Sequence, residues 1–358
     1  MFLQQNTGGH PKQLKGEMIP LGSIAAVFCS LSGGERIVSA VAAGFLLDFI
    51  FGDPAWIYHP IRMIGNLISF LTRTIRGILP KTKAGEHVGG GLLVILTVAV
   101  SAALSWIVLY LLYKISPIAG FALEAVLCGL LVAARSLQRE SMKIYHLLKK
   151  DDLEGARKAV SMIVGRDTDK LSTEGVVKAA VETVAENASD GVIAPLFWMM
   201  IGGAVWGFGY KAVNTMDSMV GYKNREFRYF GTCAAITDDV VNFLPARLAA
   251  LFMIAASFLL RMDAGNAARI WKRDRRKHAS PNSAQTESVM AGALGLQLAD
   301  DASYFGETVH KQHIGDAKRE PVPEDIIRAD RLMMAASWLS LLVFALLRYL
   351  AFAMLHGI

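Results

Sequence analysis

Three carboxylates stand at four-residue spacing immediately before an apolar stretch of the chain. If this segment is helical, Glu182, Glu186 and Asp190 share one face, where like charges repel by roughly a few tenths of a kcal/mol. The apolar stretch, residues 192–209, is long enough to enter a bilayer, and an unpaired carboxylate beside hydrocarbon costs on the order of several kcal/mol. This ladder of acids therefore predicts a cation, a charged partner or a polar cavity against its face.

A polar segment, Gly165-Arg166-Asp167-Thr168, leads into the ladder. Its planar guanidinium suits a carboxylate or a phosphate, and its aspartate or threonine is suited to cap the helix that follows. Lys178 stands four residues before Glu182 and would partly neutralise it. A solvated helix face therefore remains the competing interpretation of Glu182. Glu186, Asn187 and Asp190 lie nearer the apolar stretch, and this position favours a functional role for them.

Two more polar clusters follow the apolar stretch. In the first, polar residues recur every three or four positions and share one side of a helix whose other side is apolar. In the second, adjacent aspartates precede an asparagine, a proline and an arginine. Carboxylates with amides are good oxygen ligands for Mg²⁺, although helix capping explains either aspartate equally well. The members are Lys211, Asn214, Asp217 and Ser218 in the first cluster, and Asp238, Asp239, Asn242, Pro245 and Arg247 in the second.

An earlier cluster follows the apolar residues 37–51. Here Asp48 is followed by Gly52-Asp53-Pro54 and then by His59-Pro60-Ile61-Arg62. Glycine and proline at this density mark a structured turn, and the acids with Arg62 would suit a metal or a phosphate. A rigid loop at the membrane surface explains the same residues equally well, and His59 alone favours a structural role.

The composition is that of a membrane protein. The 358 residues are 53% hydrophobic and 19% charged, with a mean hydropathy of +0.37; soluble domains carry about 25% charge. Six Lys and Arg against one Asp at residues 269–277 fit the positive-inside rule better than nucleic-acid binding. Three scattered cysteines, with no histidine cluster, favour Mg²⁺ and phosphate chemistry over zinc or redox chemistry. No phosphate-binding G-x-x-x-x-G-K-[ST] loop, G-x-S-x-G or H-E-x-x-H motif occurs.

The elements that position these clusters are membrane helices. Residues 92–113, 118–134 and 332–355 are long and almost free of charge, as about 30 Å of hydrocarbon requires. Residues 37–51, 192–209 and 244–260 are shorter or carry polar insertions, which is typical of segments that line cavities. We therefore expect an all-α, polytopic membrane protein with about five to seven membrane segments. Residues 1–35 form an N-terminal extension of unknown role, and residues 36–358 form one catalytic domain.

The distribution of charge predicts the orientation. Basic residues follow the hairpin at 92–134 and precede the last span, so the polar segments 135–190 and 261–331 should be cytoplasmic. If residues 192–209 and 244–260 both crossed the bilayer, residues 210–243 would lie on the opposite side. We therefore expect part of residues 190–245 to be a broken or re-entrant element that lines a cavity open to the cytoplasm.

The motifs, taken together and in order, resemble the cobalamin-biosynthesis CobD/CbiB family, adenosylcobinamide-phosphate synthase. The resemblance covers roughly residues 40 to 335. Its blocks are DFIFGDP at 48–54 with His59-Pro60 and Arg62, GRDT at 165–168, ETVAENASDGVIAPLFW at 182–198, YKAVNTMDSMVGYKN at 210–224, DDVVNFLPARL at 238–248, SPNSAQTESVMAGALGLQL at 280–298 and YFG at 304–306.

The resemblance implies a multi-pass enzyme of the cell membrane with its active site on the cytoplasmic side. Such an enzyme uses ATP and Mg²⁺ to join the propionate of adenosylcobyric acid, a corrinoid, to aminopropanol or its phosphate. An acyl phosphate attacked by the amine is the simplest route, and it needs metal ligands, phosphate-binding cations and a base. The resemblance also admits a complex with other cobalamin-assembly enzymes.

The residue roles expected on this basis fall into three groups. Catalysis is assigned to Glu186, Asp190, Lys211 and Asp217. Metal binding is assigned to Asp53, Glu186, Asp217, Asp238 and Asp239. Substrate or phosphate binding is assigned to Arg62, Arg166, Asp167, Asn187, Asn214, Arg247, Ser280, Asn282 and Ser283.

Two other classes of protein are consistent with parts of the sequence. A secondary transporter also buries charges at broken spans, but no internal repeat relates the two halves of this chain. A membrane assembly partner without catalysis would account for the spans, yet it has little use for so many acids beside Arg and Lys. Substrate-dependent ATP turnover distinguishes the three classes.

Overall fold

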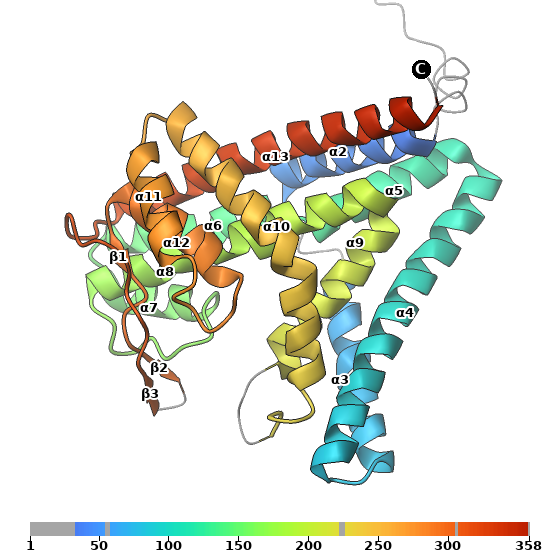
Figure 1. Cartoon of the computed structure of the whole chain (residues 1–358), viewed down its shortest axis with the longest axis horizontal. Helices are drawn as coiled ribbons and strands as arrows, with labels where there is room; N and C mark the ends of the chain where they lie inside the picture. The colour runs from blue at the N-terminus through green and yellow to red at the C-terminus, as the bar shows by residue number, and fades with distance from the viewer. Residues whose placement is uncertain (1–32, 54–57, 222–225, 305–306, 357–358) are drawn as a thin grey trace, which may run out of the picture.

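The chain folds into long helices with a small amount of sheet (Figure 1). The computed structural model describes residues 33–53, 58–221, 226–304 and 307–356. The expected extension at residues 1–35 therefore lies almost wholly outside the described residues, as do Pro54, residues 222–224 and residues 305–306 of the motif blocks. The helices are α2 (Gly33–Phe51), α3 (Pro60–Ile78), α4 (Lys83–Ile115), α5 (Pro117–Leu131), α6 (Ala134–Leu148), α7 (Leu153–Ser161), α8 (Thr173–Asn187), η1 (Ala188–Ile193), α9 (Ala194–Val220), α10 (Thr232–Leu259), α11 (Ala264–Asp274), α12 (Ser283–Leu294) and α13 (Glu324–His356).

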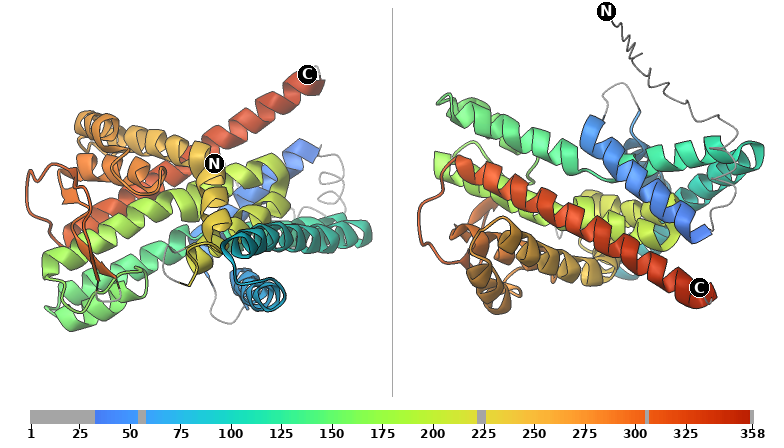
Figure 2. Two further views of the ribbon diagram at one scale, coloured as in Figure 1. Left: turned by 60° about the horizontal axis from the view of Figure 1, so that its bottom comes forward. Right: turned by 90° about the horizontal axis from the view of Figure 1, so that it is seen from above.

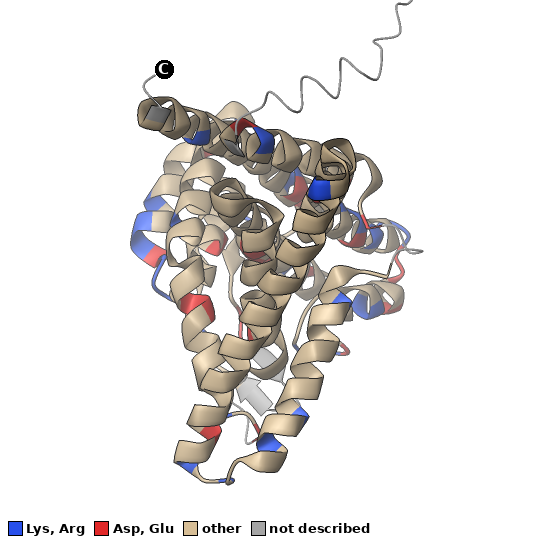
Figure 3. Cartoon of the chain, turned by 90° about the vertical axis from the view of Figure 1, so that its right-hand side faces the viewer, with Lys and Arg blue, Asp and Glu red and all other residues tan. Residues whose placement is uncertain are grey.

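In the part of the chain that the structure describes, five helical segments are long and apolar enough to cross a membrane. They are Lys83–Ile115, Pro117–Leu148, Thr173–Val220, Thr232–Leu259 and Glu324–Leu355. They contain five of the six apolar stretches predicted from the sequence. The sixth, residues 37–51, lies in α2, which is helical as expected but carries Glu35, Arg36 and Asp48 and is not among the five. Figure 3 shows that the long helices carry few charged residues along their middle.

The polar segments 135–190 and 261–331 contain several helices. Helices α6, α7, α11 and α12 lie in them and form a polar lobe together with α8, on the left of Figure 1. Two short antiparallel strand pairs are the exception to the all-α expectation. Strand β1 (Gln297–Leu298) pairs with β4 (Ile314–Gly315), and β2 (Ala302–Tyr304) pairs with β3 (Glu307–Val309).

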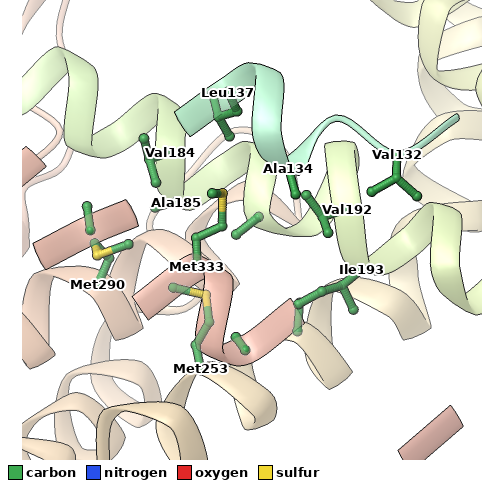
Figure 4. Close-up of a cluster of buried hydrophobic side chains, with 14 of the residues drawn as sticks. Val132, Ala134, Leu137, Val184, Ala185, Val192, Ile193, Met253, Met290 and Met333 are labelled. Atoms are coloured by element: carbon green, nitrogen blue, oxygen red, sulfur yellow. The ribbon is translucent and has the colours of Figure 1, made fainter. Parts of the chain in front are cut away.

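The acid ladder is held by the apolar back of its own helix. Val184, Ala185, Val192 and Ile193 are fully buried on α8 and η1, and they belong to a core that α6, α10, α12 and α13 complete (Figure 4). Met253, Met290 and Met333 reach this core from three different helices. Burying each such side chain is worth about 1.5–3 kcal/mol. The core therefore anchors one face of the helix and leaves the acidic face to the site.

Helix α9 is bent back on itself in the middle. Gly202 and Gly203 have non-helical backbone angles, and Gly203 has a φ of 66°, a conformation open to glycine. A straight helix would separate Asp190 from Lys211 by about 31 Å, yet the Lys211 Nζ lies 3.4 Å from the Asp190 carbonyl oxygen. The 48-residue helical stretch Thr173–Val220 is therefore not one rod. Its last part is a hairpin whose arms lie side by side, so the broken element expected within residues 190–245 is present. That this element is re-entrant and lines a cavity open to the cytoplasm stays a prediction.

Pro195 explains why the ladder ends in a π turn. In η1 the Ala194 N–H bonds to the Ser189 carbonyl, one residue further back than in an α-helix, and Pro195 has no N–H to offer. The carbonyls of Asp190 and Gly191 are thus left without helical donors. The Ala133 N–H bonds to Gly191 at 3.0 Å, and Tyr210 and Lys211 of the returning arm bond to Asp190. The third acid of the ladder therefore lies in a π turn, and not in the continuous α-helix that the spacing predicts.

Candidate active site

The adjacent aspartates lie inside helix α10 and do not cap it. Asp238 and Asp239 are in the second turn of the helix, whose N-cap is Gly231, so the capping interpretation is wrong for both. Asp238 is buried, with an exposed fraction of 9%, and its Oδ1 has no hydrogen-bond partner among the described residues. A buried charged oxygen without a partner costs free energy, so it points to a ligand.

Acids from three elements surround Asp238. Glu186 of α8, Asp190 of η1 and Asp217 of α9 all interact with it electrostatically, as does its neighbour Asp239. Asn214 of α9 lies beside it as well. The hairpin brings Asp217 here, because the returning arm runs alongside the ladder. The structure thus brings together the ladder and both later clusters, which are separated by up to 53 residues of sequence.

Lys211 is the basic member of this group. Its side chain is buried, with 8% exposed, and its charge interacts with Asp190, Asp53 and Asp238. Its neighbour Tyr210 places its hydroxyl 3.0 Å from both the Asp190 carbonyl oxygen and the Asn242 Oδ1. Lys211 and Tyr210 therefore fix the hairpin against the ladder. The lysine also supplies one positive charge within an excess of acids.

The N-terminus of α12 closes the site on another side. The Ser283 hydroxyl donates to the Glu186 Oε1 at 3.1 Å, and the Ser280 hydroxyl donates to the Asp239 Oδ1 at 3.0 Å. The Asn282 amide donates to the Asp239 carbonyl at 3.0 Å, and its Oδ1 accepts from Arg247 at 3.2 Å. These predicted substrate-binding residues thus contact the predicted metal ligands directly.

The first acid of the ladder has a different partner from the one expected. Glu182 accepts from the Arg166 guanidinium at 2.8 Å and from the Ala299 N–H at 2.8 Å, and its side chain is only 12% exposed. Lys178, the partner suggested by its spacing, instead bonds to Asp300 at 2.6 Å. The surface interpretation of Glu182 is therefore wrong. The cap of α8 is also different from the prediction, because Ser172 caps it and not Asp167 or Thr168.

Asp53 approaches the site from the turn between α2 and α3. Its Oδ2 accepts from the Ser136 hydroxyl at 2.6 Å, and its Oδ1 lies 3.2 Å from the His59 Nε2. Burial alone would raise the pKa of Asp53, but the bonds from His59 and Ser136, with the charge of Lys211, hold it below the usual value. His59 also caps α3 through its Nδ1, which agrees with its predicted structural role.

Three predicted substrate-binding residues lie apart from the acid group. Arg62 is exposed on the first turn of α3 and forms no hydrogen bond or ion pair with the carboxylates among the described residues. Asp167 is exposed in the segment before α8, and Asn187 donates to the Thr183 carbonyl of its own helix. Arg166 is occupied by Glu182. Among the cations expected to bind phosphate or take part in catalysis, Lys211 and Arg247 therefore lie closer to the acid group than Arg62 or Arg166.

Two residues beside the ladder were not predicted. Glu287 of α12 is 6% exposed and interacts electrostatically with Glu186 and Glu182, and His278 interacts with the same two glutamates. Glu287 stands within the block SPNSAQTESVMAGALGLQL, where it is the only charged residue. This single acid among uncharged residues could have identified Glu287 from the sequence, because a charged side chain in such a helix indicates a specific role.

The acid group fits a divalent cation without forming a complete site for one. No group of three or more His, Cys, Asp or Glu side chains within the described residues is arranged to hold a metal ion. Mg²⁺ is usually held by one or two carboxylates together with waters and substrate phosphates. The unpartnered Asp238 Oδ1, with Asp217 and Asp239 nearby, matches that mode of binding.

A cavity of about 690 Å³ lies away from the acids, where α2, α4 and α13 meet. It is mostly apolar, and its polar residues include Arg36, Glu124 and Arg348. Neither Lys211 nor any acid of the ladder lines it. We place the chemistry at the acids, because charge, hydrogen-bond donors and the unpartnered Asp238 oxygen converge there.

Comparison with known proteins gives a consistent result. The family model described as CobD/Cbib protein matches residues 41–333. The cobalamin biosynthesis protein CobD of Listeria monocytogenes is 46% identical over 310 residues, which cover 87% of this chain and 98% of the relative. The cobalamin biosynthesis protein CbiB of Salmonella typhi is 45% identical over 307 residues, covering 86% and 96%, and CobD of Clostridium perfringens is 43% identical over 309 residues, covering 86% and 97%. No solved structure matches the chain.

Proposed function

The chain belongs to the CobD/CbiB family and acts in cobalamin biosynthesis, and from this premise we propose that it is an ATP-dependent amide ligase. The acid would be the free propionate of adenosylcobyric acid. The amine would be aminopropanol or its phosphate, and the product adenosylcobinamide or its phosphate. The observation that carries the proposal is the group of acids around the unpartnered Asp238 oxygen, with Lys211 and Arg247 beside it.

The reaction can be written in two balanced steps. The propionate oxygen attacks the γ-phosphorus of ATP, which forms an acyl phosphate and releases ADP. The neutral amine then attacks the acyl carbon, which forms the amide and releases inorganic phosphate, while the proton of the amine passes to a base. Asp238, with Asp217 and Asp239, would hold Mg²⁺, which neutralises charge on the phosphates when bound.

The remaining residues have roles that follow from their positions. Lys211 would stabilise the negative charge that moves with the transferring phosphoryl group, because it is buried among the acids and its donor group is fixed. Arg247, held by Asn282, would contact phosphate or propionate. Ser283 orients Glu186 through a 3.1 Å hydrogen bond.

We also propose that the protein lies in the cell membrane with this site facing the cytoplasm. Five apolar helical segments support a multi-pass protein, and the basic residues of α6 and α11 lie in the polar lobe beside the site. ATP is available on the cytoplasmic side, which suits the same orientation.

A direct assay tests this proposal. Detergent-purified protein, supplied with adenosylcobyric acid, Mg-ATP and aminopropanol phosphate or aminopropanol, should yield the amide with one ATP hydrolysed per product. A transporter would move the corrinoid across vesicles without forming an amide, and an assembly partner would do neither. If no amine yields product, the ligase proposal is wrong.

A further inference from the structure

Glu287 is a buried acid that the proposed reaction has not yet used. It lies on the first turns of α12, a helix that is buried along its whole length. Its side chain is 6% exposed, and no hydrogen bond or ion pair to its carboxylate occurs among the described residues. A carboxylate buried in this way is costly for the protein unless something else binds it.

Two acids and two cations interact electrostatically with Glu287, and the effect of the acids is the larger. Glu182 and Glu186 face it from α8, Arg166 from the segment before α8, and Lys311 from the segment after β3. Arg166 already pairs with Glu182 at 2.8 Å, so its positive charge is largely balanced by that carboxylate. Burial, followed by the charges of Glu186 and Glu182, raises the pKa of Glu287 well above its usual value despite Lys311. A cation bound beside Glu287 would offset the charges of Glu186 and Glu182 and favour the ionised form of its carboxyl group.

His278 does not supply the missing positive charge. Its Nδ1 accepts a hydrogen bond from the Ser280 N–H at 3.1 Å, so this nitrogen carries no proton. Burial lowers the pKa of His278, which keeps the ring neutral with its proton on Nε2. The ring is thus a hydrogen-bond donor beside the glutamates, suited to a hydroxyl or phosphate oxygen of a ligand.

We propose that Glu287 and Glu186 form the subsite that binds the ammonium group of the amine substrate. A primary ammonium has three N–H donors and one charge, which two carboxylates from facing helices can satisfy. Glu186 also belongs to the acid group around Asp238, through which the two parts of the site are continuous. An amine held here would lie next to the phosphate-binding part, where the acyl group is activated. This inference rests on the proposed ligase function.

Binding of the amine alone tests the subsite without any turnover. We would titrate the full-length protein in detergent with 1-amino-2-propanol and, separately, with 1,2-propanediol, which has no ammonium, and measure heat of binding. Wild type should bind the amine and not the diol. Glu287→Gln keeps the shape but removes the charge, and it should weaken amine binding at least about tenfold, the equivalent of 1.4 kcal/mol.

Glu124→Gln is the matched control, since Glu124 is equally buried and accepts the Tyr113 hydroxyl at 2.6 Å far from the ladder. It should leave amine binding unchanged. Glu287→Gln should also leave the melting temperature unchanged or raise it, because an unpartnered buried acid does not stabilise the empty protein. In steady-state assays Glu287→Gln should raise KM for the amine and leave KM for ATP within about twofold.

The outcomes distinguish this inference from the proposed ligase function on which it rests. Equal amine binding by wild type and Glu287→Gln, or a lowered melting temperature with normal binding, would overturn the subsite and leave the ligase proposal intact. Amine binding that depends on Glu287, without amide formation by wild type, would support the subsite and overturn the ligase. If wild type binds amine and diol equally, no ammonium subsite exists.

Discussion

At the scale of single residues, the position of one oxygen atom decides most of the chemistry. The Asp238 Oδ1 lies buried among four other acids and, within the described residues, forms no hydrogen bond of normal geometry, although the side chains of Asn214 and Asn242 lie beside the carboxylate. Such an arrangement raises the free energy of the empty site, and a bound cation would lower that free energy. Stability and function are therefore expected to change in opposite directions when this charge is removed.

Replacing Asp238 by Asn should reduce amide formation about 100-fold or more, because the metal–phosphate unit loses a ligand. The same change should raise the melting temperature, since repulsion among the acids decreases. Activity per folded protein and thermal unfolding in detergent measure the two effects. Asp330→Asn is the control, because Asp330 is also buried but bonded to Ser141 at 2.8 Å, and its carboxylate is not among the groups that interact with the ladder. It should lower stability without affecting turnover, and full activity of Asp238→Asn would remove Asp238 from the site.

The Arg166–Glu182 pair gives a second prediction at this scale. Both side chains are largely buried, with exposed fractions of 9% and 12%. Arg166→Ala leaves an unpaired buried carboxylate and should destabilise the protein by about 3–5 kcal/mol. Adding Glu182→Gln should recover much of that loss, as a double-mutant cycle by thermal or denaturant unfolding would show. If Arg166→Ala instead raised KM for ATP with no loss of stability, the originally expected phosphate contact would be correct.

The residue types of the site were predictable from the sequence, but their pairings were not. Spacing suggested Lys178 for Glu182, and the fold supplies Arg166 from 16 residues away because the segment before α8 folds back on it. Glu287 had no recognisable partner in the sequence, since its neighbours come from α8 and from the segment after β3. Helical periodicity does not predict contacts between segments that are distant in the sequence.

At the scale of elements, the hairpin in α9 determines where the site lies. The sequence predicted a broken element within residues 190–245 without locating the break, which lies at Gly202 and Gly203. Pro195 acts in the π turn that precedes the break, where its missing N–H leaves carbonyl groups without helical donors. The proline thus creates the acceptor at Asp190, and the glycines create the bend that brings Tyr210 and Lys211 back to it.

Gly203→Ala tests the bend. A Cβ at this position would lie 2.4 Å from the Glu124 Oε1, and the φ of 66° is unfavourable for alanine by about 1–2 kcal/mol. We expect a melting temperature lowered by several degrees and a loss of turnover as Lys211 and Asp217 move. Gly77→Ala is the matched control: this helical glycine has nothing within 4 Å, and its replacement should be neutral or slightly stabilising. Equal effects of the two substitutions would contradict a special role for Gly203.

At the scale of the whole molecule, α13 spans most of its length and links the apolar helices to the polar lobe (Figure 2). The apolar spans, the all-α class and the presence of a broken segment were predictable, because hydropathy and polar interruptions carry that information. Helix α8 was expected from the ladder, whereas α6, α7 and α11 were not, because they are short and mix polar with apolar residues. The strand pairs are too short to leave a pattern.

Asp274 holds the polar lobe together and gives it a predictable dependence on pH. It joins α11 to β4, accepting from Arg273 at 2.7 Å, Lys277 at 2.8 Å and the Gly315 N–H at 2.8 Å. Burial opposes these contacts, but they hold the pKa of Asp274 well below its usual range. Its stabilising contribution is therefore complete above about pH 4 and is lost as the pH falls further. The difference in melting temperature between wild type and Asp274→Asn should be largest near pH 7 and shrink below pH 4. A difference that stays constant with pH would rule out this role.

The orphan Asp190 carbonyl before Pro195 also has a consequence for the order in which the protein is assembled during synthesis. When residue 195 leaves the ribosome, the Asp190 carbonyl has no partner, because Tyr210 and Lys211 are made later. An unpaired carbonyl is poorly tolerated in lipid, so this segment cannot enter the bilayer alone. We therefore expect the two arms to enter the bilayer together and not one after the other.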